Sequence, residues 1–160
     1  ISVATACFPE GTRGFQIDTL ARQYLWQNGM NFGHGTGHGV GFFLCVHEGP
    51  ARISPHPVDT ALEKGMLMTN EPGLYRDGEY GIRLENMVLV TGARHTEFGR
   101  FLTFENLTLC HFERELIDSH LLTDAERAWI DRYHQQVFDR ISPHLPARAA
   151  AWLKTRTAPL

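Results

Sequence analysis

A run of glycines in the first third of the chain restricts the backbone more than any other feature. Five of the nine residues from Gly33 to Gly41 are glycine, and His34 and His38 lie among them. Each glycine costs a helix about 0.8–1 kcal/mol relative to alanine, so a stable helix is excluded here. We expect turned or extended backbone that can approach a ligand closely.

Helices are expected before this run and again near the end of the chain. Asp18 is a suitable N-cap for the first helix, and an Asn-Gly pair at 28–29 supplies its stop signal. A capping box begins at Thr123, and apolar residues follow at helical spacing until Pro143. We expect the aromatic side chains of this second helix, Trp129 and Tyr133, to pack into a core, with a partner subunit as the alternative. A further short helix is predicted over residues 147–154.

Between the helices the sequence alternates extended segments and turns. Strands are predicted over residues 66–71, 82–90 and 107–112. The turn between the first two is centred on Gly78, and Glu71 and Glu85 each lie seven residues from it. A hairpin folded there would set these carboxylates opposite each other, which is destabilising unless they share a proton or bind a cation. Spacing alone equally allows a longer loop with two solvated glutamates.

Three histidines lie within fourteen residues, at His34, His38 and His47. Because the glycines prevent a helix, His34 and His38 are not expected to form a helical chelating pair, and different roles are predicted for them. A single glycine-flanked histidine is more often structural than catalytic, but three so close together favour a functional cluster. Arg83 shares a strand face with Glu85 and can hold that carboxylate, although a surface ion pair would look the same.

Composition excludes several classes of function. The formal net charge of −3 provides no basic surface for nucleic acid. No apolar run reaches the roughly 18–20 residues that a membrane span requires. The three cysteines are widely spaced and form no C-x-x-C motif, so we expect them to be buried and reduced in a cytoplasmic protein, without thiolate zinc.

Four motifs occur in a diagnostic order along the chain. They are His34-Gly-Thr-Gly-His38, Val46-His-Glu-Gly-Pro50, Asn70-Glu-Pro-Gly73 and Gly81-Ile-Arg-Leu-Glu-Asn86. In combination they closely resemble the pita-bread metallopeptidases, and within that superfamily the aminopeptidase P branch. The resemblance covers essentially the whole chain. It implies an α+β fold, with residues 1–113 as the C-terminal half of the pita-bread catalytic domain and residues 114–160 as a helical extension.

The same resemblance implies a role for each matching residue. His38 is similar to the single histidine ligand of one metal, and Glu85 to the glutamate that bridges two metals. Glu71 matches a carboxylate ligand that also carries the proton of the nucleophilic water. His34 is similar to a histidine beside the proline pocket, and His47 to one that stabilises the tetrahedral intermediate. Arg83 matches an arginine that supports these ligands.

The implied activity is metal-dependent removal of the residue before a proline. Two divalent ions are expected, manganese first and zinc or cobalt otherwise, because the ligands are oxygen-rich with one imidazole. The substrates would be peptides with proline at the second position. Members of the family often dimerise, so a second copy is a candidate partner.

The family pattern requires two aspartate ligands that do not occur before Asp18. The chain therefore carries three of five ligands and is expected to be the last part of a longer enzyme, inactive alone. Two alternatives stay open. One is a pita-bread binding module without catalysis, and the other is a prolidase or creatinase type of hydrolase.

Overall fold

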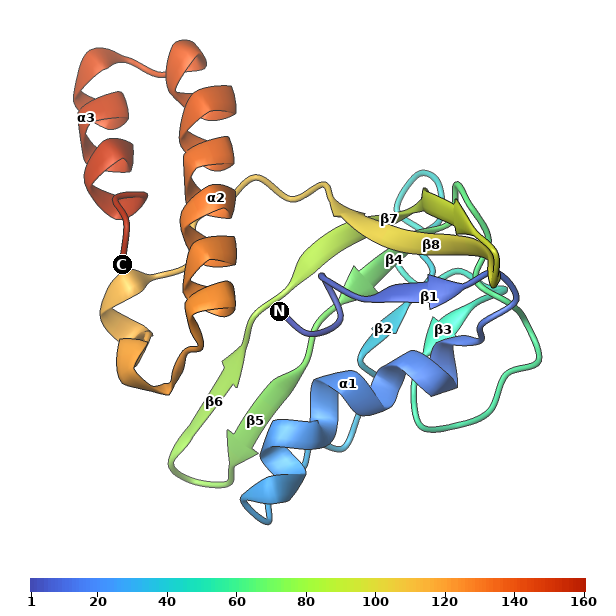
Figure 1. Ribbon diagram of the computed structural model, residues 1–160. Coiled ribbons are helices and arrows are strands. Elements are labelled where there is room, and N and C mark those ends of the chain that lie inside the picture. The colour runs from blue at the N-terminus through green and yellow to red at the C-terminus, as the bar shows by residue number, and fades with distance from the viewer. The chain divides into compact units, whose positions relative to one another are not determined.

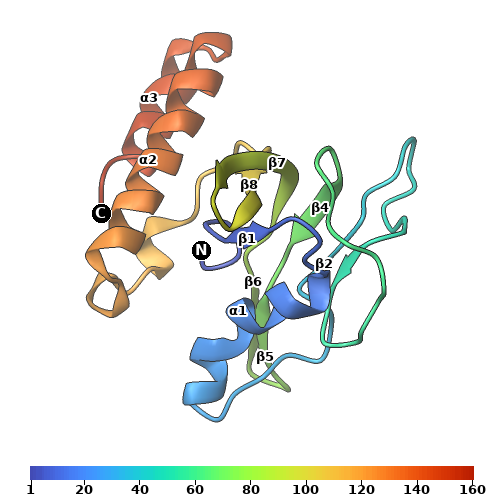
Figure 2. The same ribbon diagram turned by 45° about the vertical axis from the view of Figure 1, so that its right-hand side comes forward.

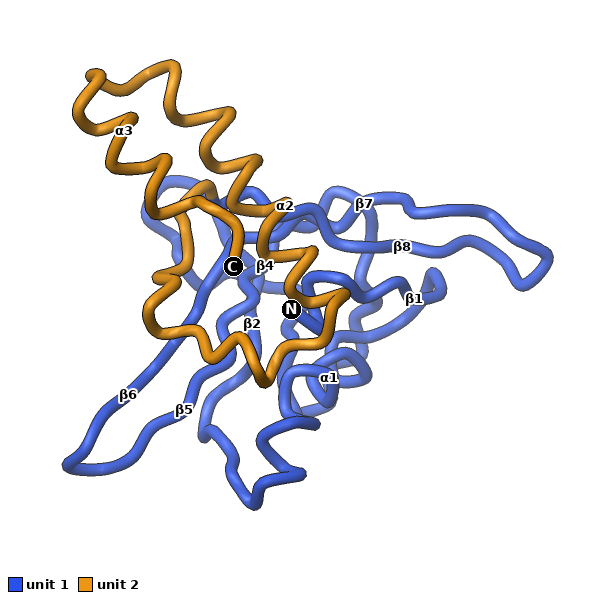
Figure 3. The backbone as a smooth tube through the Cα atoms, turned by 60° about the vertical axis from the view of Figure 1, so that its left-hand side comes forward, with its two compact units in different colours: residues 1–108 blue, residues 109–160 orange.

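The computed structural model describes residues 1–160, which divide into two compact units (Figure 3). Residues 1–108 form the first unit and residues 109–160 the second. The first unit combines a sheet with one long helix, and the second contains only helices. No helix of the chain is both long and apolar enough to cross a membrane.

A four-stranded antiparallel sheet organises the first unit (Figure 1). Its strands, in spatial order, are β1 (Cys7–Pro9), β8 (Gly99–Asn106), β7 (Asn86–Thr96) and β4 (Leu67–Asn70). A register shift between Gly92 and Arg94 interrupts the long β7–β8 ladder. Side chains of these strands supply half of the buried core residues, namely Phe8, Met68, Val88, Val90, Leu102 and Phe104.

A short two-stranded ribbon lies beside β4. It consists of β2 (Gly37–His38) and β3 (Arg52–Ile53), in which His38 pairs with Arg52. The ribbon continues toward the sheet through a bridge between Gly39 and Met68, so the glycine run is extended backbone as the sequence predicts. Ile53 is fully buried, which fixes the ribbon in the core.

The segment between β4 and β7 is a hairpin of β5 (Gly73–Arg76) and β6 (Tyr80–Arg83). Its turn contains Gly78 at φ +74°, a conformation that glycine adopts without strain. Asn70 pairs with Asn86, and Gly73 pairs with Arg83, so both ladders are symmetric about Gly78. The predicted register of the hairpin is confirmed. The predicted strand over 82–90 is instead divided between β6 and β7.

The first helix, α1 (Gly14–Gln27), begins earlier than predicted, so the assignment of Asp18 as its N-cap is wrong. Arg13 is the N-cap instead, and its backbone N–H donates to the side-chain oxygen of Gln16 at 2.8 Å. Asp18 is buried and binds Arg22 one turn later, as well as Thr36 from the glycine run. Its carboxylate therefore holds a loop and does not cap a helix.

The N-terminal segment contains no helix, and the cysteines differ from expectation. Residues 1–5 make a single turn and the chain then enters β1, so no helix spans residues 1–8. Cys7, Cys45 and Cys110 are free but exposed, so their predicted burial is wrong. Cys45 and Cys110 lie in irregular segments, and Cys7 lies on an outward position of β1.

The second unit is built around two helices, α2 (Asp124–Ile141) and α3 (Ala147–Arg156). Thr123 caps α2 in the predicted capping box with Glu126. Trp129 and Tyr133 stack with an interplanar angle of 3°, and Phe112 stacks on Tyr133, which confirms that the aromatic side chains form a core. Three short 3₁₀ helices complete the unit, η1 (Arg114–Leu116), η2 (Ser119–Leu121) and η3 (Ser142–His144).

Residues 107–112 form no strand, contrary to the sequence prediction. Two of their apolar side chains pack in the helical unit instead. Leu109 and Phe112 pack on its core, and the Cys110 carbonyl accepts from the Tyr133 hydroxyl at 2.8 Å. Leu109 and Phe112 are therefore packed on helices and have no sheet partner.

The buried His134 makes the stability of the second unit sensitive to pH. Its Nε2 accepts from the Phe112 backbone N–H at 3.1 Å and must therefore be unprotonated. Burial lowers the pKa of His134 below its ordinary value of 6.5, and the charges of His111 and Arg114 lower it further against the opposing effect of Asp131. The unfolded chain then binds the proton more tightly, so stability is complete above about pH 6.5 and falls at lower pH.

We expect the Tm to decrease between about pH 7.5 and about pH 5, measured by circular dichroism at 222 nm. In His134→Gln, whose amide oxygen can accept the same N–H, this pH dependence should be reduced. His144→Gln changes an exposed histidine of the same unit and is the matched control. A pH dependence identical in all three proteins would contradict the role of His134.

Candidate metal centre

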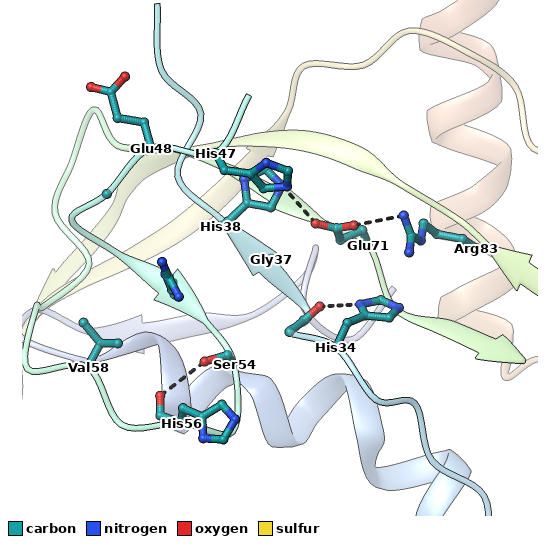
Figure 4. A pocket seen from close by; sticks show the side chains of 13 residues that line it. His34, Gly37, His38, His47, Glu48, Ser54, His56, Val58, Glu71 and Arg83 are labelled. Carbon is teal, nitrogen blue, oxygen red and sulfur yellow. Dashed lines mark hydrogen bonds and ion pairs between the residues drawn. The ribbon is translucent and has the colours of Figure 1, made fainter. Parts of the chain in front are cut away.

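A pocket of about 460 Å³ opens in the first unit (Figure 4). It contains five of the six residues predicted from the sequence to form the site, namely His34, His38, His47, Glu71 and Arg83. Gly35 and Gly37 form part of its wall. Further lining residues are Glu48, Gly49, Arg52, Ser54, His56 and Val58.

His38 and Glu71 converge inside this pocket. The Nδ1 atom of His38 lies 2.9 Å from the Gly39 carbonyl oxygen, which can only accept a hydrogen bond. Nδ1 therefore carries the proton, and the lone pair is on Nε2. That atom lies 3.1 Å from Oε1 of Glu71. A dashed line marks this contact in Figure 4. Two electron-pair donors that face each other so closely suit a proton or a metal cation between them.

Thr69 on β4 holds both ligand candidates in position. Its hydroxyl donates to Oε1 of Glu71 at 2.9 Å and accepts from the His38 backbone N–H at 3.0 Å. The Glu71 N–H donates to the Thr36 carbonyl at 2.7 Å. Thr69 and Glu71 are both buried. The edge of β4 therefore fixes the imidazole and the carboxylate as one rigid group.

An ion pair followed by hydrogen bonds connects Glu71 with the hairpin. NH1 of Arg83 lies 3.6 Å from Oε2 of Glu71, and Nε of Arg83 donates to the Tyr75 hydroxyl at 2.8 Å. The Tyr75 hydroxyl is 2.8 Å from Nε2 of His34, whose Nδ1 is 2.7 Å from the Gly35 carbonyl. Since Nδ1 must donate to that carbonyl, Tyr75 donates to Nε2.

The charge of Arg83 is reinforced by the same contacts. The hydrogen bond with Tyr75, together with the charges of Tyr75, Glu71 and Glu85, raises the pKa of the Arg83 guanidinium above its already high ordinary value. Partial burial opposes this increase. Arg83 is thus a permanent cation beside Glu71 at every physiological pH.

His47 returns to the site after an exposed loop. The loop is closed by the Gly41 N–H, which donates to the Cys45 carbonyl at 2.9 Å. The imidazole of His47 then lies over that of His38, with ring centroids 4.3 Å apart. No side-chain hydrogen bond fixes the His47 ring nitrogens within the chain, so they are free to contact a bound molecule.

An ion pair in α1 anchors the glycine run from behind. Arg22 and Asp18 are almost fully buried and lie 2.6 Å apart. Arg22 donates to the carbonyls of Phe32 and His34, and Asp18 accepts from the Thr36 hydroxyl at 2.7 Å. The helix thereby sets the path of the backbone that carries His34 and His38.

Glu85, the sixth predicted residue, does not line the pocket. It is exposed and lies in the break between β6 and β7, where it is close enough to Arg83 to influence its charge. No three histidine, cysteine, aspartate or glutamate side chains of residues 1–160 are arranged to hold a metal ion. The metal-ligand role of Glu85 therefore stays a prediction.

The residues that are present fit part of a metal site. An imidazole with its Nε2 lone pair available and a buried carboxylate oxygen are both suitable ligands for manganese or zinc. Arg83 and Thr69 orient the carboxylate, as partners of metal ligands commonly do. The fit is incomplete, because His38 and Glu71 alone cannot satisfy the coordination of one ion.

Several residues of the site were missed by sequence reasoning. Thr69 and Tyr75 contact the predicted residues, but neither is part of a sequence motif that indicates a functional site. Arg22 was detectable in principle, because Asp18 and Arg22 have the i, i+4 spacing of a helical ion pair. Arg52 and His56 line the pocket without any motif around them.

Two family models match the chain. Metallopeptidase family M24 matches residues 1–92, and the C-terminal region of peptidase M24 matches residues 100–160. The first match covers more than half of the chain and contains every residue of the candidate site. The second covers the helical unit.

Individual relatives agree with these models. A probable Xaa-Pro aminopeptidase P of Coprinopsis cinerea is 48% identical over 100% of this chain and 27% of its own length. The crystal structure of an X-prolyl aminopeptidase from Caenorhabditis elegans, described as a cytosolic enzyme with a di-nuclear active site, superposes with a TM-score of 0.93. It is 38% identical and covers 99% of this chain and 27% of its own. A prolidase from Pyrococcus furiosus gives a TM-score of 0.55 at 34% identity over 71% of this chain and 29% of its own. The chain thus spans about a quarter of the length of the relatives it matches.

Proposed function

Because the chain belongs to metallopeptidase family M24 and has its pita-bread fold, we propose that the whole protein is a Xaa-Pro aminopeptidase. It would hydrolyse the peptide bond between an N-terminal residue and a following proline. The observation that carries this proposal is the 3.1 Å approach of His38 Nε2 to Glu71 Oε1 in a pocket that also contains His34, His47 and Arg83. Two relatives that match nearly the whole chain carry the same activity in their names.

Two divalent ions would complete the site, with His38, Glu71 and Glu85 among their ligands and the remaining ligands outside residues 1–160. When bound, such ions act as Lewis acids and lower the pKa of a nucleophilic water to near neutral. We propose manganese, since carboxylate ligands with a single imidazole suit it.

The residues of this chain would then transfer the proton of the attacking water and stabilise the negative charge on the scissile carbonyl oxygen. Glu71 accepts the proton of the attacking water and passes it toward the proline nitrogen as the peptide bond breaks. Arg83 keeps Glu71 oriented through the ion pair between them. His47 donates to the oxyanion that develops on the scissile carbonyl, a contact that strengthens in the transition state.

Proline selection would depend on shape, because its tertiary amide offers no N–H. His34 is suited to form a rigid wall of the proline pocket. Its ring is held at both nitrogens, by Gly35 and by Tyr75, and it packs against Phe32 with centroids 5.0 Å apart. A ring that cannot turn gives a pocket of fixed width.

His47→Ala in the whole protein is expected to lower kcat by about a hundredfold and to change KM far less, measured by steady-state hydrolysis of a Xaa-Pro peptide. The reason is that His47 contacts the oxyanion only as it forms. His95→Ala alters an exposed histidine on β7, away from the pocket, and should leave both constants unchanged. An effect of His47→Ala on KM alone would contradict this assignment.

Two other functions stay possible for this fold. A binding module without catalysis would bind peptide but not metal, and a prolidase would cleave dipeptides but not longer substrates. Metal analysis together with assays on Xaa-Pro dipeptides and longer Xaa-Pro peptides separates all three. The whole protein should bind about two metal ions and cleave the longer peptides, whereas residues 1–160 alone should do neither efficiently.

The setting of the enzyme follows from the same comparison. We propose that it acts in the cytoplasm, as the similar enzyme of C. elegans does by its description. Peptides with proline at the second position are the proposed partners, and a second copy of the protein is a further candidate.

A further inference from the structure

One arginine that lines the pocket has no partner for its charge. Arg52 is on β3, where its Cα is paired with that of His38 on β2. Directly paired residues of antiparallel strands extend their side chains from the same face, with Cβ atoms about 4.5–5.5 Å apart. Both side chains line the pocket, so the exposed Arg52 side chain begins beside His38.

The carboxylates of the pocket do not neutralise Arg52. Glu71 is engaged by His38, Arg83 and Thr69. Glu48 lies against Cys45, and this contact raises the pKa of the Cys45 thiol. No carboxylate lies within 4.0 Å of the Arg52 guanidinium, whereas Arg13, Arg22, Arg83 and Arg156 all have one. Arg52 is exposed, and a cation that lines a pocket without a carboxylate partner attracts an anionic ligand.

The backbone around Arg52 is fixed. Ile53 is fully buried, and the buried Ser54 donates its hydroxyl to the His56 carbonyl at 3.2 Å. Figure 4 shows Ser54, His56 and Val58 together at the opposite side of the pocket from Glu71 and Arg83. The pocket therefore has a metal-facing end and a second end that bears a histidine beside an apolar side chain.

The reach of the Arg52 side chain suits the part of a peptide that follows the scissile bond. An extended peptide advances about 3.3–3.6 Å per residue, so the group one to two residues beyond that bond lies roughly 4–7 Å away. A long arginine side chain that starts beside His38 can reach this distance. Carboxylate groups pair with guanidinium through two parallel hydrogen bonds.

We propose that Arg52, with His56 at the same end of the pocket, forms a carboxylate-binding subsite for the segment that follows proline. This inference rests on the proposed function for the direction in which the peptide lies. The carboxylate can come from the C-terminus of a short peptide or from an aspartate side chain directly after proline. In either case Arg52 determines specificity and takes no part in bond cleavage, which the proposed mechanism assigns to Glu71 and His47.

Three peptides test the subsite in the whole protein. They are Ala-Pro-Ala with a free carboxylate, the same peptide as its C-terminal amide, and Ala-Pro-Asp amide. The wild-type kcat/KM should be roughly tenfold higher for the free acid than for the amide, as expected for one charge-assisted contact. A comparable advantage of Ala-Pro-Asp amide would assign the contact to the side chain as well.

Substitutions identify the residue responsible. Arg52→Gln should abolish the preference for the carboxylate while it cleaves the neutral amide at the wild-type rate, and Arg52→Lys should keep part of the preference. Arg94→Gln removes an exposed arginine of β7 outside the pocket and should keep all of it. Equal kcat/KM for acid and amide in the wild type, or an unchanged preference in Arg52→Gln, would overturn the proposal.

A binding measurement keeps this test independent of hydrolysis. Calorimetry compares the dipeptide Pro-Ala with Pro-Ala amide, neither of which has a residue before proline to remove. Tighter binding of the acid to the wild type, lost in Arg52→Gln, supports the subsite even if no peptide is cleaved. In that case the aminopeptidase proposal would fail and the subsite would stand. Equal binding of acid and amide would refute the subsite.

Discussion

Glu71→Gln is expected to lower kcat of the whole protein by about three orders of magnitude, a loss within the range known for removal of a general base. The amide has nearly the same shape as the carboxylate and can still accept from Thr69. It cannot take the proton of the attacking water, and it binds a divalent cation poorly. Steady-state hydrolysis, metal content and the circular dichroism spectrum should be measured on the same preparation.

The control for this variant is Glu63→Gln, which removes an exposed carboxylate from the turn before β4. It should retain wild-type kcat and metal content. If Glu71→Gln retained activity with an unchanged metal content, Glu71 would be neither ligand nor base, and the proposed mechanism would be wrong. A loss of metal with a native spectrum would instead show that the ligand role dominates.

Gly37→Ala should be the most damaging substitution of the glycine run. A Cβ on Gly37 would overlap the carbonyl oxygen of Thr69 on β4, so the β2–β3 ribbon would have to move away. Overpacking of this kind costs about 3 kcal/mol at its upper end. Displacement of His38 from Thr69 and Glu71 by even an ångström should also lower kcat/KM by about a hundredfold.

Gly33→Ala is the matched control, because a Cβ there meets no atom within 4 Å. Its Tm, free energy of unfolding and kcat/KM should be close to those of the wild type. If the two variants were equally stable, the contact between β2 and β4 would not be the reason for glycine at position 37.

The sequence predicts the fold where local chemistry decides the outcome. The capping box at Thr123 marks the start of α2, and the residues around Gly78 define a hairpin with the correct register. It fails where distant contacts decide. Aspartate is a common N-cap residue, but the Asp18 carboxylate binds Arg22 and Thr36 instead. Residues 107–112 resemble a strand in sequence, but Leu109 and Phe112 pack on helices.

The same distinction applies to the site. His34, His38, His47, Glu71 and Arg83 were predicted from motifs and meet in one pocket. The residues that orient them were not predicted, because Thr69 and Tyr75 acquire their roles only when β4 and the hairpin bring them against His38 and Arg83. Arg52 is similar, since only its pairing with His38 brings it into the pocket.

The symmetric pairing about Gly78 limits how this hairpin can change in length. Successive residues of a strand face opposite sides of the sheet. Loss of one residue from β5 alone would therefore place Gly73 and Tyr75, which now face the same side, on opposite sides. The ladder between β4 and β7 would lose its alignment as well. Removal of one residue from each strand, at directly paired positions, would keep the pairing but move every side chain between the deletion and the turn to the opposite face of the hairpin. Only deletions or insertions of two residues per strand keep both faces, so natural length variants of this hairpin should occur in steps of four.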